Sequence, residues 1–336
     1  MSLPEPVLTV NDLSVSFETD DGLVEAVNDV TFEVRPGEAL GVVGESGSGK
    51  SVTAMAIMGL LPKTANITGE VLYHGQDLLT ISRAEMRKKQ GNDIAMIFQD
   101  PMTALNPVFT VGNQLIEAIR IHNKGVSKQA ARARAVDLLD LVGIPEPGIR
   151  VDNYPHEFSG GMRQRAMIAM AIANEPEVLI ADEPTTALDV TIQAQVIEVM
   201  EKAREETGAA MMLITHDLGL VAGVADRINV MYGGRIFESG DTRTVFYESV
   251  NPYTRGLMSS IPNFAAREHE RLDPIPGSPP SPSNFPSGCV FRPRCPHVVD
   301  RCKEERPALM TVEGSHRTRC HVWDRLPALE TAEAAS

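Results

Sequence analysis

The stretch Gly44-Glu45-Ser46-Gly47-Ser48-Gly49-Lys50-Ser51 carries the pattern G-x-x-x-x-G-K-[S/T] and decides the fold of this 336-residue chain. Its glycines let the backbone curl into a nest of N–H groups, which is a binding site for phosphate oxygens. The apolar run from Glu38 to Gly44 predicts a buried strand before the loop, and Val52 to Leu61 predicts a helix after it. Since the pattern binds phosphates between a strand and a helix, this order predicts a site for a nucleoside triphosphate.

The residues of this loop are expected to make different contacts with the phosphates and with Mg²⁺. Lys50 brings a full positive charge to the outer phosphates, and the Ser51 hydroxyl is a ligand for Mg²⁺. The helix N-terminus adds a partial positive charge worth about 0.3–2 kcal/mol. The predicted nucleotide contacts are Gly44, Glu45, Ser46, Gly47, Ser48, Gly49, Lys50, Ser51 and Val52. The alternative is a glycine-rich turn that contains lysine by chance, and the flanking strand and helix disfavour it.

Two adjacent carboxylates, Asp182 and Glu183, end a second apolar run, residues 178–182, which predicts another buried strand. Ligands of open α/β sheets lie at the carboxyl ends of the strands, so the pair is expected beside the phosphate loop. We assign Asp182 to the Mg²⁺ shell, and Glu183 to orienting or deprotonating the water that attacks the γ-phosphate. Taken alone, such a pair would also fit a solvated turn.

The same argument places His216 near this edge. His216 follows the buried run from Met211 to Thr215, and we predict that it contacts the γ-phosphate and the attacking water. A lone histidine is more often structural, so the prediction depends on its position beside the phosphate site. Gln99 lies at the junction between the core and a helical stretch, and a glutamine there is uninformative by itself.

A further motif, residues 158–165 (Phe-Ser-Gly-Gly-Met-Arg-Gln-Arg), resembles the signature sequence of the ATPases of ABC transporters. Its order relative to the phosphate loop, Gln99, the Asp182-Glu183 pair, residues 186–189 and His216 is also the order of that family. The usual family sequence is Leu-Ser-Gly-Gly-Gln, so this chain departs from it at both ends and keeps the central Ser-Gly-Gly.

By this resemblance the chain is an ATPase whose cofactors are ATP and Mg²⁺. Ser51, Gln99 and Asp182 would hold the metal, and Gln99 would also sense the γ-phosphate. Phe17 matches the aromatic residue that stacks on adenine, whereas a phenylalanine in an alternating strand is more often a core residue. The implied fold is α/β: a RecA-like phosphate-loop core with a helical insert and an antiparallel β subdomain, which the alternation from Leu8 to Val34 also predicts.

The signature motif is a second anion site in physical terms. Ser159, Gly160 and Gly161 precede a helix that is predicted to begin near Met162, so they offer a capping hydroxyl, bare amides and a positive helix end. The resemblance implies that two ATPase subunits pair head to tail, with this motif closing over the partner's γ-phosphate and Asp189 on the seam. An isolated Ser-Gly-Gly would also fit an ordinary helix cap.

Bulk composition excludes several other classes. A net charge of −14 disfavours nucleic-acid binding, which needs a positive surface. No apolar stretch approaches the roughly 20 residues that cross a bilayer. The N-terminus lacks the basic and apolar regions of a secretory signal, so a reducing compartment is expected.

Changes of composition divide the chain into parts. Residues 1–260 are expected to form the nucleotide-binding domain, with the helical insert at about 100–175. A Pro/Ser-rich linker is expected at 261–287, a cysteine-bearing module at 288–324 and a disordered tail at 325–336.

The four cysteines of the chain all lie in its last fifty residues, in a segment with little aliphatic material for a core. They are Cys289, Cys295, Cys302 and Cys320. A reducing compartment disfavours disulfides, so we expect a metal centre held by thiolates, either zinc or an iron–sulfur cluster, with free buried cysteines as the alternative. The gaps of 5, 6 and 17 residues are wider than the tight pairs typical of zinc sites.

The passage around Cys289 and Cys295, with Ile275-Pro-Gly-Ser-Pro-Pro before it, resembles the C-terminal extension of ATPases from dipeptide and oligopeptide importers. The resemblance implies a [4Fe–4S] cluster on the four cysteines. It also implies partners: a second, related but non-identical ATPase subunit, two membrane permease subunits and, indirectly, an extracytoplasmic solute-binding protein. The chain would then lie on the cytoplasmic face of the inner membrane. A nickel importer of the same branch and a soluble ABC-type ATPase without a permease remain open.

Overall fold

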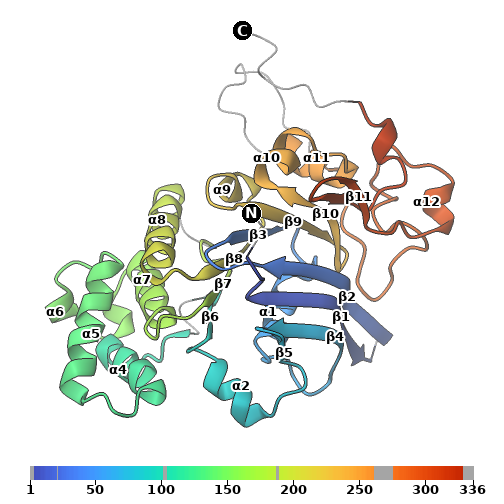
Figure 1. Cartoon of the computed structure of the whole chain (residues 1–336). Helices are drawn as coiled ribbons and strands as arrows, with labels where there is room; N and C mark the ends of the chain where they lie inside the picture. The colour runs from blue at the N-terminus through green and yellow to red at the C-terminus, as the bar shows by residue number, and fades with distance from the viewer. Residues whose placement is uncertain (1–3, 21, 101–103, 187–188, 261–274, 328–336) are drawn as a thin grey trace, which may run out of the picture. The chain divides into compact units, whose positions relative to one another are not determined.

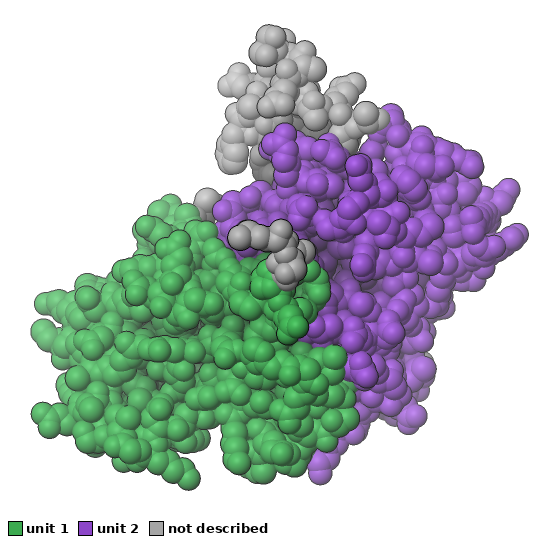
Figure 2. Space-filling model, in the orientation of Figure 1, with its two compact units in different colours: residues 1–8, 33–38, 72–214 green, residues 9–32, 39–71, 215–336 purple. Residues whose placement is uncertain are grey.

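The computed structural model describes residues 4–20, 22–100, 104–186, 189–260 and 275–327 (Figure 1). The chain forms two compact units, which are coloured separately in Figure 2. Unit 1 comprises residues 1–8, 33–38 and 72–214, and unit 2 comprises residues 9–32, 39–71 and 215–336. Most of the predicted linker and most of the predicted tail (residues 261–274 and 328–336) lie outside the described residues.

Unit 2 contains strands that are hydrogen-bonded in the order β11-β12-β10-β9-β3. They are β3 (Ala39–Val43), β9 (Arg227–Tyr232), β10 (Arg235–Asp241), β11 (Met310–Glu313) and β12 (His316–Thr318). The pair β3 and β9 is parallel, whereas the pairs β9–β10, β10–β12 and β11–β12 are antiparallel. The C-terminal residues therefore extend the sheet through β10.

A second group of strands lies largely within unit 2, in the order β2-β1-β4. The bounds are β1 (Leu8–Thr19), β2 (Gly22–Val34) and β4 (Ala65–Tyr73). The helices of unit 2 are α1 (Lys50–Ile57), α9 (Leu218–Ala222), α10 (Thr242–Tyr247), α11 (Pro252–Ser259), α12 (Arg301–Glu304) and a 3-10 turn, η2 (Trp323–Arg325).

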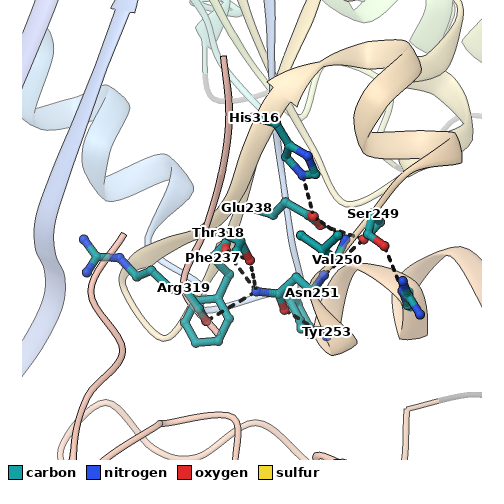
Figure 3. A network of polar contacts seen from close by, with 10 residues as sticks. Phe237, Glu238, Ser249, Val250, Asn251, Tyr253, His316, Thr318 and Arg319 are labelled. Carbon is teal, nitrogen blue, oxygen red and sulfur yellow. Dashed lines mark hydrogen bonds and ion pairs between the residues drawn. The ribbon is translucent and has the colours of Figure 1, made fainter. Parts of the chain in front are cut away.

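A buried polar network ties β12 to β10 and to the start of α11 (Figure 3). Glu238 is fully buried, and its carboxylate accepts hydrogen bonds from the Ser249 hydroxyl at 2.7 Å and the Val250 N–H at 2.7 Å. It also contacts His316 Nε2 at 2.9 Å. The side-chain amide of Asn251 donates to the Phe237 carbonyl at 2.9 Å. Since a buried polar group without a partner is unfavourable, this network specifies where β12 attaches.

Unit 1 contains the parallel strands β8 (Ala210–Thr215), β7 (Val178–Asp182) and β6 (Ile94–Ile97), in that order. All residues of these strands are buried, which explains why their sequences are continuous apolar runs without alternation. The remaining elements are β5 (Gln76–Asp77), α2 (Arg83–Lys89), α4 (Val111–His122), α5 (Lys128–Leu141), α6 (Pro147–Arg150), η1 (Pro155–Glu157), α7 (Gly160–Ala171) and α8 (Val190–Thr207).

The observed elements match the sequence predictions with one notable shift. The strand predicted before the phosphate loop is β3, and the apolar run that ends in the acid pair is β7. The helix predicted from Val52 to Leu61 instead begins at Lys50 and ends at Ile57. It ends early because Gly59 adopts a φ of 61°, a left-handed conformation that an α-helix does not contain. Within the described residues, no helix is long and apolar enough to cross a membrane.

Candidate functional site

The phosphate loop of unit 2 has a backbone that only glycine can adopt at two positions. Gly44 has a φ of 155° and Gly49 a φ of 99°. A Cβ atom at Gly44 would lie 2.1 Å from the Met231 carbonyl oxygen, and one at Gly49 would lie 2.5 Å from that of Ala26. The loop ends directly at the N-terminus of α1, so its amides and the positive end of that helix belong to one site.

Lys50 is folded back over this loop. Its side chain is buried, and the ammonium donates hydrogen bonds to the carbonyl oxygens of Gly44 at 2.7 Å and Glu45 at 3.0 Å. Burying an ammonium group is unfavourable unless it is paired or hydrogen-bonded, and these carbonyls satisfy that requirement. The residues that follow, Ser51 and Val52, lie in the first turn of α1 and are partly exposed. The arrangement is suited to receive the oxygens of a phosphate chain.

Glu45 has a partner that sequence reasoning missed. Its carboxylate accepts two hydrogen bonds from Arg294, at 2.6 and 2.9 Å, and its N–H donates to the Tyr253 hydroxyl at 3.0 Å. Arg294 lies 249 residues away along the chain, and no local pattern in the sequence marks the pair.

Unit 2 also contains two other predicted site residues. Phe17 lies in β1 and is partly exposed, whereas Leu13 and Val15, which precede it at alternate positions, are buried. It therefore lies on the same face of the strand as Leu13 and Val15 but is less buried than they are. His216 directly follows β8 and is exposed.

The acid pair lies at the end of β7 in unit 1. Asp182 is 6% exposed, and Glu183 has a φ of 46°, which is unusual for a residue with a side chain. The Glu183 N–H donates to the Ile214 carbonyl at 2.9 Å, which fixes this conformation against β8. Backbone strain of this kind, worth about 1–3 kcal/mol, is typical of functional positions.

The structure brings Gln99 and Glu183 together. The side-chain amide of Gln99 donates to Glu183 Oε2 at 3.1 Å, and the Thr186 hydroxyl donates to the same oxygen at 2.9 Å. Gln99 follows β6 and Glu183 follows β7, so the parallel pairing of these strands delivers both side chains to one edge. Sequence reasoning missed the contact of Thr186, although a hydroxyl three residues after the carboxylate is a recognisable local signal. Two donors orient the Glu183 carboxylate.

The signature motif caps helix α7, also in unit 1. Ser159 is the N-cap, and its hydroxyl accepts a hydrogen bond from the Met162 N–H at 3.3 Å. The helix begins at Gly160, two residues before the predicted start. A Cβ atom at Gly161 would approach the Ile192 side chain to 3.0 Å, which explains the need for a small residue there. The cap interpretation is therefore correct, and a capped, exposed helix N-terminus remains available to an anion.

Asp189 is the N-cap of α8, and its carboxylate accepts a hydrogen bond from the Ile192 N–H at 3.0 Å. This contact by itself accounts for the acidic residue, because such caps stabilise a helix by about 0.5–2 kcal/mol. The predicted nucleotide residues thus divide between the units. Unit 2 holds the phosphate loop, Phe17 and His216, and unit 1 holds Gln99, the acid pair, the signature motif and Asp189.

The four cysteines are free thiols that line a single cavity of about 20 Å³. Burial, together with a smaller contribution from the neighbouring cysteines, raises the pKa of Cys289 to about 11 and that of Cys320 to about 12. Within the described ranges, no group of three or more His, Cys, Asp or Glu side chains is arranged so that it could hold a metal ion. The structure therefore does not support the predicted metal centre, although it does gather the four thiols around one cavity.

Two family models match the chain. The model described as ABC transporter matches residues 27–186, and the model described as Oligopeptide/dipeptide transporter, C-terminal region, matches residues 237–302. An ATP-binding cassette, solved as a dimer in a post-hydrolysis state bound to ADP and Pi, is similar with a TM-score of 0.63 and 26% identity. That comparison covers 70% of this chain and 99% of the cassette.

Curated relatives are similar over nearly the whole chain. The oligopeptide transport ATP-binding protein OppD of Mycobacterium tuberculosis is 52% identical over 94% of this chain, which spans only 52% of that relative's length. The dipeptide transport ATP-binding protein DppD of Escherichia coli is 50% identical, with 94% of this chain and 96% of the relative covered. This similarity agrees with the phosphate loop, the acid pair and the signature motif found in the α/β fold. The chain therefore belongs to the ABC transporter ATP-binding proteins, in the oligopeptide and dipeptide transport family.

Proposed function

We propose that the chain binds ATP with Mg²⁺ and hydrolyses it to energise the import of dipeptides or oligopeptides through a membrane permease. The observation that carries the proposal is the phosphate loop, in which Lys50 lies over backbone carbonyls at the N-terminus of α1. The names of the relatives support peptide transport as the process that uses this energy.

Each site residue takes the role that its chemistry allows. Ser51, Asp182 and Gln99 provide oxygen ligands for Mg²⁺, which prefers such donors. Glu183 orients or deprotonates the attacking water, and the hydrogen bonds from Gln99 and Thr186 hold its carboxylate in one orientation. His216 contacts the γ-phosphate, and Phe17 stacks on adenine.

The active form requires a second ATPase subunit. The exposed N-terminus of α7, with Ser159 as its cap, presents backbone amides that are suited to bind an anion supplied by a second subunit. In a head-to-tail pair, Ser159, Gly160, Gly161 and Met162 of one subunit close over the γ-phosphate held by the other, and Asp189 lies on the seam. The similar cassette was solved as a dimer. We propose a related but non-identical partner, two permease subunits and an extracytoplasmic binding protein that delivers the peptide. The chain is then peripheral on the cytoplasmic face of the inner membrane.

The cysteines fit a metal centre by donor chemistry and not by their present geometry. Four thiols supply the ligand set of a [4Fe–4S] cluster, or of zinc as the alternative. Their raised pKa values mean that binding must displace protons and reorient side chains. We propose a structural cluster in the predicted C-terminal cysteine module, residues 288–324. A content of about four iron and four sulfide ions per chain after anaerobic purification would support the cluster, whereas about one zinc ion per chain without iron would favour the alternative.

The test of the main proposal is the Glu183→Gln variant, assayed for phosphate release with Mg²⁺ and ATP after co-expression with its transporter partners. Loss of the base should lower turnover by about 10²-fold or more, while ATP stays bound. Glu198→Gln, a surface change on α8, is the matched control and should keep full activity. Undiminished hydrolysis by Glu183→Gln would refute the role of Glu183, and failure of the unaltered protein to bind ATP would refute the function.

A further inference from the structure

Glu45 is the second residue of the phosphate loop, and its N–H, its carbonyl oxygen and its carboxylate all form hydrogen bonds. Its N–H donates to the Tyr253 hydroxyl at 3.0 Å, and its carbonyl oxygen accepts a hydrogen bond from Lys50 Nζ at 3.0 Å. Its carboxylate accepts two hydrogen bonds from Arg294. The conformation of the loop at this residue is therefore linked to α11 and to the cysteine-bearing segment 288–324.

Arg294 is buried and oriented so that its guanidinium faces Glu45. Its side chain is 4% exposed, and the two hydrogen bonds to Glu45, at 2.6 and 2.9 Å, form a bidentate pair. Its Nε donates to the Pro276 carbonyl at 2.9 Å, which fixes the orientation of the guanidinium plane. Bidentate pairs of this kind are stronger and more directional than a single contact to a lysine.

An aromatic cluster makes this connection rigid. The rings of Tyr232, Tyr253 and Phe291 lie with centroids 4.6 to 5.3 Å apart, and all three residues are at most 3% exposed. The Arg294 guanidinium lies 5.8 Å from the centroid of Tyr232 and 6.0 Å from that of Phe291. Phe291 and Arg294 come from the cysteine-bearing segment, whereas Tyr232 ends β9. Since packed aromatic rings have little freedom, Arg294 cannot move without disturbing this cluster.

We propose that Arg294 is a positioning residue of the phosphate loop, which neutralises the Glu45 carboxylate and holds the loop in its nucleotide-binding conformation. This inference rests on the proposed binding of ATP. It assigns to the C-terminal segment a direct part in nucleotide affinity.

Charge is the physical basis of the effect. Glu45 places a carboxylate in a loop that must receive a highly charged anion, and like charges repel at short range. The positive guanidinium of Arg294 neutralises that carboxylate through direct pairing. Without Arg294, the carboxylate opposes the nucleotide, and the penalty grows with the number of phosphates. The main loss is expected in affinity, because the pair lies in the phosphate loop of unit 2, whereas Glu183, the proposed base, belongs to unit 1.

The test compares Arg294→Met, Glu45→Gln and the double variant in the full chain, with ATP and AMP affinities measured by titration calorimetry in the presence of Mg²⁺. Arg294→Met should weaken ATP binding about tenfold, equivalent to about 1.4 kcal/mol. It should weaken AMP binding less than threefold. In the Glu45→Gln background, where the repelling charge is absent, Arg294→Met should change ATP affinity less than threefold. Steady-state kinetics of the assembled transporter should show a raised KM with kcat changed less than twofold.

The matched control is Arg292→Met, because the Arg292 side chain donates hydrogen bonds to Ser287 and Lys303 and, among the described residues, to no residue of the phosphate loop. It should leave ATP affinity unchanged, and thermal melts should verify that all variants are folded. An equal loss of ATP affinity in both Glu45 backgrounds, or an equal loss for AMP and ATP, would overturn the proposal. No loss in Arg294→Met while the unaltered chain binds ATP would also overturn it and leave the proposed function intact. Absence of ATP binding by the unaltered chain would instead refute the proposed function.

Discussion

Replacing Glu238 by leucine should strongly destabilise the attachment of the C-terminal strand β12. Glu238 is fully buried and serves three groups: the Ser249 hydroxyl, the Val250 N–H and the His316 ring (Figure 3). Each buried polar group that is left without its partner lowers the free energy of unfolding by about 1–3 kcal/mol. Leucine recovers about 1.5–3 kcal/mol by burying apolar surface. We expect a net loss of about 3–5 kcal/mol, which is typical when one partner of a buried polar pair is removed.

The assay is thermal and urea unfolding followed by fluorescence of Trp323, the single tryptophan, which lies five residues after β12. A unit of this size shifts its midpoint by about 2–4 °C per kcal/mol, so a decrease of about 6–20 °C is expected. The control is Glu248→Leu, the same change at an exposed position, which should shift stability by less than about 0.5 kcal/mol. If Glu238→Leu unfolds within 1 °C of this control, the network does not anchor the strand.

Two further predictions follow from local geometry. Gly49→Ala should lower the free energy of unfolding by about 1–3 kcal/mol and abolish most nucleotide binding, because the φ of Gly49 is 99° and the new Cβ atom would lie 2.5 Å from the Ala26 carbonyl oxygen. A thermal melt measures the stability and calorimetry measures the binding, and a variant as stable as the parent would refute the steric argument. Arg132→Met should destabilise by about 0.2–1 kcal/mol at pH 7, since Arg132 pairs with the exposed Asp152. The hydrogen bonds of Arg132 lower the pKa of Asp152, so their contribution is present above the usual carboxyl pKa of 3.8 and disappears as the pH falls through the lowered value. Urea unfolding at pH 7 and pH 2 should show the difference between variant and parent shrinking, and a constant difference would contradict it.

Much of the fold was predictable from local patterns. The buried strands β7 and β8 are continuous apolar runs, and the stretch that forms α4 has apolar residues at helical spacing. The end of α1 was misplaced because Gly59, a local break, lay inside a run that otherwise looked helical. The joining of residues 316–318 to β10 was not predicted, since three residues carry no detectable period.

The candidate site shows the same division. Sequence order was enough to expect the Asp182-Glu183 pair at the carboxyl edge of the sheet, whereas the contact between Gln99 and Glu183 appeared only in the structure. It was not enough to find Arg294, which reaches Glu45 only through folding of the C-terminal segment. The cysteines were predicted to act together, and the structure gathers them around one cavity without arranging them as metal ligands.

By itself the sequence determined the phosphate loop, the acid pair and the signature motif, because their chemistry depends on residues that are consecutive and on backbone conformations that only glycine adopts. The tertiary structure alone decided the partner of Glu45 and the burial of Glu238. These features depend on side-chain contacts between distant or differently oriented segments. Packing and the need to satisfy buried polar groups select such contacts, and neither is encoded in any short stretch of the chain.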